Sequence, residues 1–286
     1  MTRAGTVPDN DREGEARRKP ELAIRIASAI VLAALALAAA IYRPWTFLIL
    51  VMVGGLIVAW EWGRLTRGNG FDGTALISGV GVCAIAILVA VGRADFALFV
   101  LGAAAIVIGL TAYRTGDAFW PLAGLAYAAL PAAALVWLRG DPSFGAAAVL
   151  YLFAVAWTTD TASYVAGRLI GGPRLAPSIS PKKTWSGFIV GTLAPSLVGV
   201  AFASALEETS AMKLAVVSIV LALACQLGDL VESAVKRRFG VKDASRMIPG
   251  HGGLLDRIDG LLLAAIVAAL IALRDVASPG RGLLIW

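Results

Sequence analysis

The amino-acid sequence predicts an all-α protein that crosses a membrane several times, and three observations support this fold class. Of the 286 residues, 59% are hydrophobic and 15% are charged, a composition that ordinary soluble domains do not have. The apolar residues form continuous runs of membrane-spanning length instead of the alternating pattern of a β-barrel. The runs are rich in alanine and other small residues, which let helices pack closely in lipid.

The expected elements begin after a polar tail. Residues 1–20 carry nine charges and no apolar run, which predicts a disordered tail. The first apolar run is long enough to span a bilayer and too long for the core of a cleavable signal peptide. Residues 21–286 are expected to form one integral-membrane domain, with its catalytic part at about 150–275. About nine spans are expected, at residues 22–41, 45–62, 74–91, 96–113, 119–138, 145–165, 187–206, 212–235 and 258–273.

The basic residues predict the orientation, because loops rich in lysine and arginine stay on the cytoplasmic side. With a cytoplasmic N-terminus, the inside segments collect nineteen of the 25 Lys and Arg residues and the outside segments hold six. The tail and the two polar loops after the sixth and eighth spans then face the cytoplasm, with the protein in a bacterial-type inner membrane. The basic residues lie between apolar runs without interleaved exposed aromatics, so the expected partner is the lipid bilayer and not nucleic acid.

Polar residues interrupt the eighth apolar run near its end. Four of them share one face of a helix, because they follow i, i+3, i+4 and i+7 spacing. These are Asp229, Glu232, Ser233 and Lys236. Asp229 is expected roughly 10 Å deeper in the membrane than Lys236. An ionised carboxylate at that depth needs a cation or a water-filled cavity.

The loop that follows combines basic residues, glycines and the only histidine, His251. Glycines there allow tight turns or a close approach of the backbone to a ligand. Asp256 and Asp259 then lie three residues apart at the first turn of the last expected span. Together with Asp229 they give three carboxylates, from two adjoining helices, that can converge.

Clustered carboxylates beside a basic, glycine-rich loop suit a divalent cation that holds a polyphosphate. The acids bind Mg²⁺, while the metal and the Lys and Arg side chains bind phosphate oxygens. Phosphoryl or nucleotidyl transfer follows as the reaction class. The sequence contains neither a GxxxxGK[ST] segment nor a GxGxxG after a strand, so the usual soluble nucleotide-binding folds are excluded by motif. His251 is expected to contact phosphate, with a structural or proton-carrying role as the alternative.

The loop after the sixth span repeats this design. Asp160 lies on the polar face at the end of that span, and Lys182 and Lys183 follow in the loop. An acid inside a membrane is a functional candidate by default. The alternative is that Asp160 pairs with an arginine of a neighbouring helix and that the two lysines bind anionic headgroups. Glu61, close to Arg64, is expected to form a structural ion pair.

Between Ser233 and Asp259 the sequence reads S-x-x-K-R, four residues, K-D, and later P-G-H-G-G, two residues, D-R-x-D. This pattern resembles the signature of the phosphatidate cytidylyltransferases, also called CDP-diacylglycerol synthases. The resemblance covers most of the chain from the second span onward and is weakest in the tail and the first span. Two positions differ from the family pattern, Thr159 where asparagine is usual and Ser186 where glutamate is usual, so neither is given a polar role.

The resemblance implies an enzyme that joins CTP and phosphatidic acid to give CDP-diacylglycerol and pyrophosphate. It also implies Mg²⁺, often a second, monovalent cation such as K⁺, and commonly a homodimer. The expected metal ligands are Asp229, Asp256 and Asp259. The expected catalytic residues are Lys236, Asp256, Asp229 and His251. The expected substrate-binding residues are Ser233, Arg237, Lys242, Gly252, Gly253, Arg257, Asp160, Lys182 and Lys183.

Three alternatives are weaker. The segment Asp256–Gly260 superficially resembles the D-x-x-D-G opening of CDP-alcohol phosphotransferases, but residues 261–273 contain none of the further acids which those enzymes need. A CTP-dependent polyprenol or phytol kinase is closer in architecture and differs in its product. An ion-coupled transporter also uses intramembrane acids, but here the acids cluster at the ends of spans.

Overall fold

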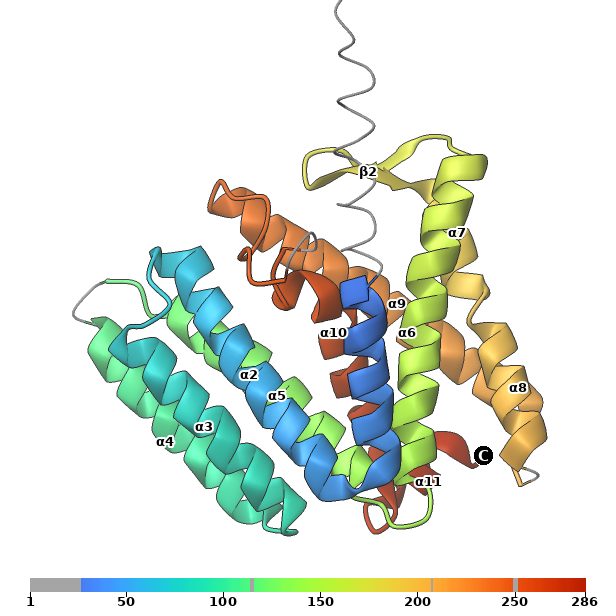
Figure 1. Cartoon of the computed structure of the whole chain (residues 1–286), viewed down its shortest axis with the longest axis horizontal. Coiled ribbons are helices and arrows are strands. Elements are labelled where there is room, and N and C mark those ends of the chain that lie inside the picture. Colours follow the sequence, from blue (N-terminus) through green and yellow to red (C-terminus); the bar gives the residue numbers. More distant parts are fainter. Residues whose placement is uncertain (1–26, 114–115, 207, 249–251) are drawn as a thin grey trace, which may run out of the picture.

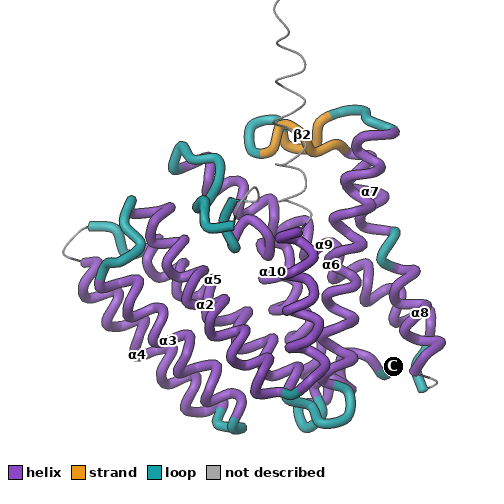
Figure 2. The backbone as a smooth tube through the Cα atoms, in the orientation of Figure 1, coloured by secondary structure: helices purple, strands orange, loops and turns teal. Residues whose placement is uncertain are grey.

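The computed structural model describes residues 27–286 except 114–115, 207 and 249–251 (Figure 1). Three predictions fall outside the described residues: the disordered tail, the start of the first span and the contacts of His251. The described chain is almost entirely helical, with one small pair of strands (Figure 2).

The elements follow the order of the expected spans, and most of their bounds agree with the apolar runs. In chain order they are the Ala27–Tyr42 helix, α2 (Pro44–Arg67), α3 (Gly73–Ala90), α4 (Ala94–Tyr113), α5 (Phe119–Arg139), α6 (Gly145–Leu169), β1 (Arg174–Ala176), β2 (Ser180–Thr184), α7 (Trp185–Leu193), α8 (Ser196–Leu206), α9 (Ala211–Arg238), α10 (Leu255–Ala272), the 3₁₀ helix η1 (Leu273–Asp275) and α11 (Pro279–Leu284).

In the described part of the chain, six helices are long and apolar enough to cross a membrane: α2, α3, α4, α5, the α7–α8 unit and α9. This agrees with a helical membrane protein. Two further expected spans are helices that carry charge, since α6 contains Asp160 and α10 begins with Asp256, Arg257 and Asp259. The count of nine spans and the cytoplasmic N-terminus stay predictions.

Local sequence signals explain how the helices begin and end. Gly68 ends α2 with a φ of 73°, in the left-handed region that glycine adopts without steric cost. Asp72 then caps α3, because its carboxylate accepts a hydrogen bond from the Ala75 amide at 2.7 Å. Arg67 reaches across the turn to Asp72, with Nε 2.5 Å from Oδ2. This tight connection makes α2 and α3 antiparallel neighbours.

Two features depart from the expected all-helical chain of unbroken spans. The seventh span is divided into α7 and α8 at Pro195, which has no N–H to donate and cannot continue the hydrogen-bond ladder of a helix. The loop after α6 contains an antiparallel hairpin, in which Arg174 pairs with Thr184 and Ala176 with Ser180. The hairpin leads directly into α7.

The helices form two groups with α10 between them (Figure 1). Helices α2 to α5 pack against one another, α6 packs on α7, and α8 packs on α9; α10 contacts both α5 and α9. The crossing of α9 and α10 is close, because a Cβ atom on Gly228 would lie 2.7 Å from the Asp259 carbonyl oxygen. The hairpin and the loop between α9 and α10 lie at the same end of the bundle (Figure 1).

Candidate active site

Lys236 lies at the centre of the most buried charged cluster in the described chain. Its ammonium nitrogen is 2.5 Å from Glu232 Oε2 and 2.7 Å from Asp256 Oδ1. The side chains of Glu232 and Asp256 are only 1% and 7% exposed. Glu232 and Lys236 lie one helical turn apart on α9, and Asp256 belongs to the first turn of α10. The lysine therefore joins α9 to α10 through Asp256, and Glu232 of its own helix lies beside this contact.

Asp256 also organises the loop between α9 and α10. Its Oδ2 accepts hydrogen bonds from the Gly253 amide at 2.8 Å and from the Ala244 amide at 3.0 Å. Gly252 has a φ of 83°, and a Cβ atom there would lie 2.9 Å from Asp256 Oδ2. The two glycines thus let the backbone approach the carboxylate closely, as the sequence indicates.

Glu61 supports this loop from α2, and its role differs from the expected ion pair with Arg64. Its carboxylate is fully buried and accepts hydrogen bonds from the Leu254 and Leu255 amides at 3.0 and 2.6 Å. Ser245 donates a third hydrogen bond at 2.5 Å. The first amides of a helix lack hydrogen-bond partners within the helix. A carboxylate accepts hydrogen bonds from these amides, and its negative charge interacts favourably with the positive end of the helix dipole. Glu61 is thus a positioning residue that fixes the start of α10.

The hairpin contributes a second lysine and carboxylate pair. Lys183 Nζ lies 2.6 Å from Asp229 Oδ2, and Ser233 Oγ donates to Asp229 Oδ1 at 3.4 Å. Arg237 donates from Nε to the carbonyl of Ile179, in the hairpin turn, at 3.2 Å. The expected substrate-binding residues Lys183 and Arg237 therefore hold the hairpin against the end of α9, while Ser233 bonds to Asp229 within α9.

Three acids from three helices lie within electrostatic reach of one another: Asp160, Asp229 and Asp259. Asp229 and Asp259 lie at the close crossing of α9 and α10, each next to a glycine of its own helix, Gly228 and Gly260. No group of three His, Cys, Asp or Glu side chains gathers as a metal-binding set within the described residues. The three expected metal ligands are thus divided, with Asp256 held by Lys236 while Asp229 and Asp259 interact with Asp160.

Buried polar atoms near these acids lack hydrogen-bond partners in the described part of the chain. They are the Tyr127 hydroxyl and the two carboxylate oxygens of Glu232. Glu232 contacts Lys236, but without the geometry of a hydrogen bond. Tyr127 interacts electrostatically with Asp259, Glu232 and Asp229. Unsatisfied polar atoms around hard carboxylate oxygens are a chemical environment that fits a hydrated cation.

The remaining predicted residues lie at the edges of the cluster. Lys182 is exposed on β2 and Lys242 on the loop after α9, and Arg257 is exposed on α10 within electrostatic reach of Asp160. Thr159 donates its hydroxyl to the Val155 carbonyl at 2.8 Å, and Ser186 donates to the Gly171 carbonyl. These last two side chains bond to nearby backbone.

Sequence reasoning gave no site role to three residues of the cluster. It placed Glu232 on the polar face of α9, and the i, i+4 spacing from Glu232 to Lys236 is a signal that could have identified their contact. Glu61 and Tyr127 come from α2 and α5, far away in the sequence, and no local pattern connects either residue to the loop.

The arrangement suits the binding of a polyphosphate. Lys183 and Lys236 are each held on a carboxylate at the end of α9 where the glycine-rich loop begins. Cations fixed in this way, in a partly dry environment, can stabilise negative charge on phosphate oxygens without reorganising. Carboxylate oxygens of this kind are the hard ligands that a divalent cation prefers.

Comparison with known proteins gives one consistent result. Residues 23–273 match the Cytidylyltransferase family. A phosphatidate cytidylyltransferase of Brucella suis biovar 1 (strain 1330) is 39% identical over 268 residues, which cover 90% of this chain and 97% of that protein. A protein of the same name from Rickettsia typhi (strain ATCC VR-144 / Wilmington) is 29% identical over 268 residues, covering 91% and 96%. Another from Staphylococcus saprophyticus subsp. saprophyticus is 41% identical over 147 residues, covering 51% and 55%.

Proposed function

The chain belongs to the Cytidylyltransferase family, and we propose that it is a phosphatidate cytidylyltransferase, which joins CTP and phosphatidate to give CDP-diacylglycerol and pyrophosphate. The observation that carries this proposal is the similarity to relatives of that name along 90% of the chain. The family resemblance of residues 233–259 agrees with it. Neither the lipid kinase nor the ion-coupled transporter finds support among these relatives.

The reaction needs no covalent intermediate on the protein. A phosphatidate phosphate carries one to two negative charges near neutral pH, so its oxygen attacks the α-phosphorus of CTP, the bond to the β-phosphate oxygen breaks, and pyrophosphate leaves. The protein aligns the two phosphates and neutralises their charge. In our proposal Lys236 and Lys183 contact the CTP phosphates, and Arg237, Lys242 and His251 are further phosphate contacts, as the sequence predicts. Gly252 and Gly253 keep the loop backbone close to the nucleotide.

We assign the metal to Asp229, Asp256 and Asp259, as the sequence predicts. Bound Mg²⁺ supplies Lewis-acid polarisation of phosphate oxygens. Two observations support a cation here: the buried Glu232 Oε1, which has no hydrogen-bond partner among the described residues, and the mutual interaction of Asp229 and Asp259 at the α9–α10 crossing. In this proposal Lys183 and Lys236 neutralise Asp229 and Asp256 while no substrate is present. A second, monovalent cation such as K⁺ is part of the same proposal.

We further propose nine spans, a cytoplasmic N-terminus, an inner-membrane location with the active site facing the cytoplasm, and a homodimer. The orientation is supported by the excess of basic residues in the segments assigned to the inside, nineteen of 25. The dimer is what the family resemblance implies.

The experiment that tests the reaction uses purified protein with labelled CTP and phosphatidic acid, in the presence and absence of Mg²⁺. We expect CDP-lipid and pyrophosphate in equal amounts, and only when the metal is present. Phosphorylated lipid with CDP as the second product would instead identify a kinase. An ion flux in proteoliposomes without any CTP turnover would identify a transporter.

The site itself is tested by two neighbouring lysines of β2. Lys183→Ala removes the partner of Asp229 and should lower kcat/KM for CTP by about tenfold to hundredfold, the value of one charge-assisted hydrogen bond. Lys182→Ala is the matched comparison. Lys182 was an expected substrate contact as well, but it is exposed on the same strand, so in our proposal it contributes little to CTP binding and its removal should leave kcat/KM within about twofold of wild type. Equal losses in both variants would mean that the hairpin binds lipid headgroups and not CTP.

A further inference from the structure

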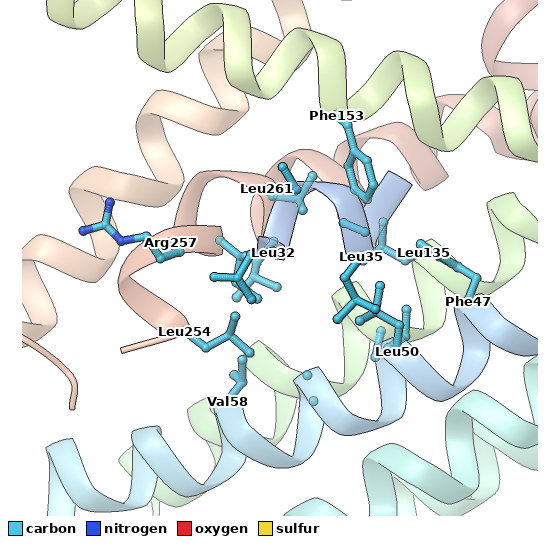
Figure 3. Close-up of a pocket in the computed structure, with 18 of the residues that line it drawn as sticks. Leu32, Leu35, Phe47, Leu50, Val58, Leu135, Phe153, Leu254, Arg257 and Leu261 are labelled. Carbon is cyan, nitrogen blue, oxygen red and sulfur yellow. The ribbon is translucent and has the colours of Figure 1, made fainter. Parts of the chain in front are cut away.

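A cavity of about 340 Å³ lies between the Ala27–Tyr42 helix, α2, α5, α6 and α10 (Figure 3). Its walls are aliphatic and aromatic, with Leu32 and Leu35 on the first helix, Leu50 on α2, Leu135 on α5 and Phe153 on α6. Arg257 is the one charged side chain among the described residues that line the cavity. The volume lies within the range of small-molecule pockets, about 300–1,000 Å³.

Helix α10 separates this cavity from the acid and lysine cluster. Leu254, Ile258 and Leu261 line the cavity and follow i, i+4 and i+7 spacing, so they share one face at the start of the helix. Asp256 and Asp259 project from the opposite side, where Asp256 meets Lys236. The same two turns of α10 thus present an apolar surface to the cavity and carboxylates to the polar site.

Arg257 connects the two sides. In Figure 3 it lies at one end of the cavity, with its guanidinium directed away from the leucines. The guanidinium is within electrostatic reach of Asp160, which itself interacts with Lys183 and Asp229. A molecule with an apolar tail in the cavity and an anionic head at Arg257 would therefore place the head beside the cluster proposed to bind CTP.

We propose that this cavity binds an acyl chain of the lipid substrate, with the phosphate of phosphatidate at Arg257. The inference rests on the proposed function and names the site of its second substrate. An arginine matches a phosphate monoester because its planar fork donates two parallel hydrogen bonds to the oxygens. The apolar walls select a hydrocarbon chain, and the combination of both ends selects a lipid with a small anionic headgroup.

Gly54 on α2 allows a sharp test of this assignment. It lines the cavity, and a Cβ atom there would lie 3.9 Å from Leu254 Cδ2, at ordinary van der Waals distance. Gly54→Leu should therefore fill part of the cavity. The matched control is Gly102→Leu on α4, where a Cβ atom would meet nothing within 4 Å. A second filling variant from the opposite wall is Ala36→Phe on the Ala27–Tyr42 helix.

The measurement is the KM for phosphatidate with two long acyl chains and with two six-carbon chains, together with the KM for CTP. For Gly54→Leu and Ala36→Phe we expect the KM for the long-chain lipid to rise about tenfold, a loss corresponding to about 1.4 kcal/mol of binding. The KM values for the short-chain lipid and for CTP should stay within about twofold, and Gly102→Leu should match wild type in all three.

Lipid binding in the absence of turnover provides the second readout. It is measured by native mass spectrometry of detergent-purified protein mixed with equal amounts of long-chain phosphatidate and long-chain phosphatidylcholine. Wild type should retain phosphatidate in preference, and Gly54→Leu should lose it. Equal retention of both lipids would mean that the cavity holds bulk membrane lipid, and would overturn the proposal. Equal KM increases for long and short chains would overturn it too. Wild-type protein that forms no CDP-lipid at all would instead refute the proposed function.

If Gly54→Leu does not fold, Ala36→Phe answers the same question from the other wall. Wild-type KM values in a folded filling variant would also reject the acyl site.

Discussion

Lys236 holds a structural position in the buried cluster and, in our proposal, also contacts the substrate. One ammonium group lies between two carboxylates that are almost completely buried. Asp256 is stabilised further by two backbone amides and by the N-terminus of α10. Glu232 has no such donors. The carboxylate of Glu232 therefore depends on Lys236 more strongly than that of Asp256 does.

We predict that Lys236→Ala loses both activity and stability. Removal of one partner leaves buried carboxylates without their cation, which costs about 3–5 kcal/mol. The double variant Lys236→Ala/Glu232→Gln removes one of the two stranded charges, so it should regain much of the lost stability. It should not regain turnover, because the phosphate contact is still missing. Thermal melting in detergent and the rate of CDP-lipid formation measure the two effects separately.

Two outcomes would contradict this account. If Lys236→Ala melts at the wild-type temperature, the ion pairs do not stabilise the fold. If the double variant recovers turnover together with stability, Lys236 acts only through the structure and makes no substrate contact. Glu232→Gln alone is the control, since it keeps the lysine and its contact with Asp256.

For single residues, the sequence predicted which polar side chains share a helix face, but not which partners they contact. The helical spacing of Asp229, Ser233 and Lys236 correctly predicted one polar face at the end of α9. It could not show that Lys183 would meet Asp229, because the two residues are joined only by the fold of the hairpin. The expected pairing of Glu61 with Arg64 was wrong. Glu61 instead accepts hydrogen bonds from amides at the start of α10, almost two hundred residues away, and no local sequence pattern predicts this contact.

Among the elements, the crossing of α9 and α10 determines where the acids meet. Gly228 and Gly260 face each other there, since a Cβ atom on Gly260 would lie 2.9 Å from the Cys225 carbonyl oxygen. Small residues at helix interfaces allow backbones to approach closely in a membrane. The neighbouring residues Asp229 and Asp259 are carried into mutual reach by the same approach.

We predict that Gly228→Ala pushes the two helices apart. Its Cβ atom would lie 2.7 Å from a backbone oxygen, a contact that cannot be relieved by a side-chain rotation. Overpacking of this kind costs about 1–3 kcal/mol, and the displaced acids should lower turnover as well. Gly102→Ala is the control in open space on α4 and should be neutral or slightly stabilising. Unchanged melting and turnover in Gly228→Ala would show that the crossing is not tight.

At the opposite end of the bundle, Asp141 joins three elements. It is 2% exposed and accepts hydrogen bonds from the amides of Phe144 at 2.8 Å and Gly280 at 3.0 Å, at the starts of α6 and α11. Ser278 donates its hydroxyl to the same carboxylate. Burial raises the pKa of Asp141, but the hydrogen bonds to its ionised form outweigh burial and hold the pKa below its ordinary value.

This shift predicts a pH dependence of stability. Because the folded pKa of Asp141 is lowered, its contribution is complete above the pKa of the unfolded chain, about 3.9, and is lost as the pH falls through the folded value. The melting temperature of wild type should exceed that of Asp141→Asn at neutral pH, and the difference should shrink below about pH 4. A difference that stays constant across this range would mean that the asparagine, and not the lost charge, causes the change.

For the whole molecule, composition and apolar runs were sufficient to predict a helical membrane protein and most of its helix bounds. Pro195 is a sequence signal for the division of the seventh span. The hairpin before that span has no comparable signal, because its two strands are short and polar. Composition also could not reveal the apolar cavity, since its walls come from five helices that meet only in the folded chain. Local patterns predict elements, whereas cavities and buried ion pairs depend on how the elements pack.

The final prediction concerns the orientation of the whole bundle. The hairpin and the loop after α9 lie at one end, and the turn between α3 and α4 lies at the other (Figure 1). The nineteen basic residues assigned to the inside, against six outside, predict that the end with the hairpin faces the cytoplasm. Single cysteines at two exposed positions, Lys242→Cys and Arg93→Cys, test this in a Cys83→Ala background.

In intact spheroplasts, a membrane-impermeant maleimide should label Arg93→Cys and leave Lys242→Cys unmodified; in inverted vesicles the pattern should reverse. The background protein is the control, because its remaining thiol, Cys225, is buried and should not react. CTP does not cross a membrane unaided, so an active site on the outer face would have no access to it. Labelling of Lys242→Cys in spheroplasts would therefore contradict both the orientation and the placement of the active site.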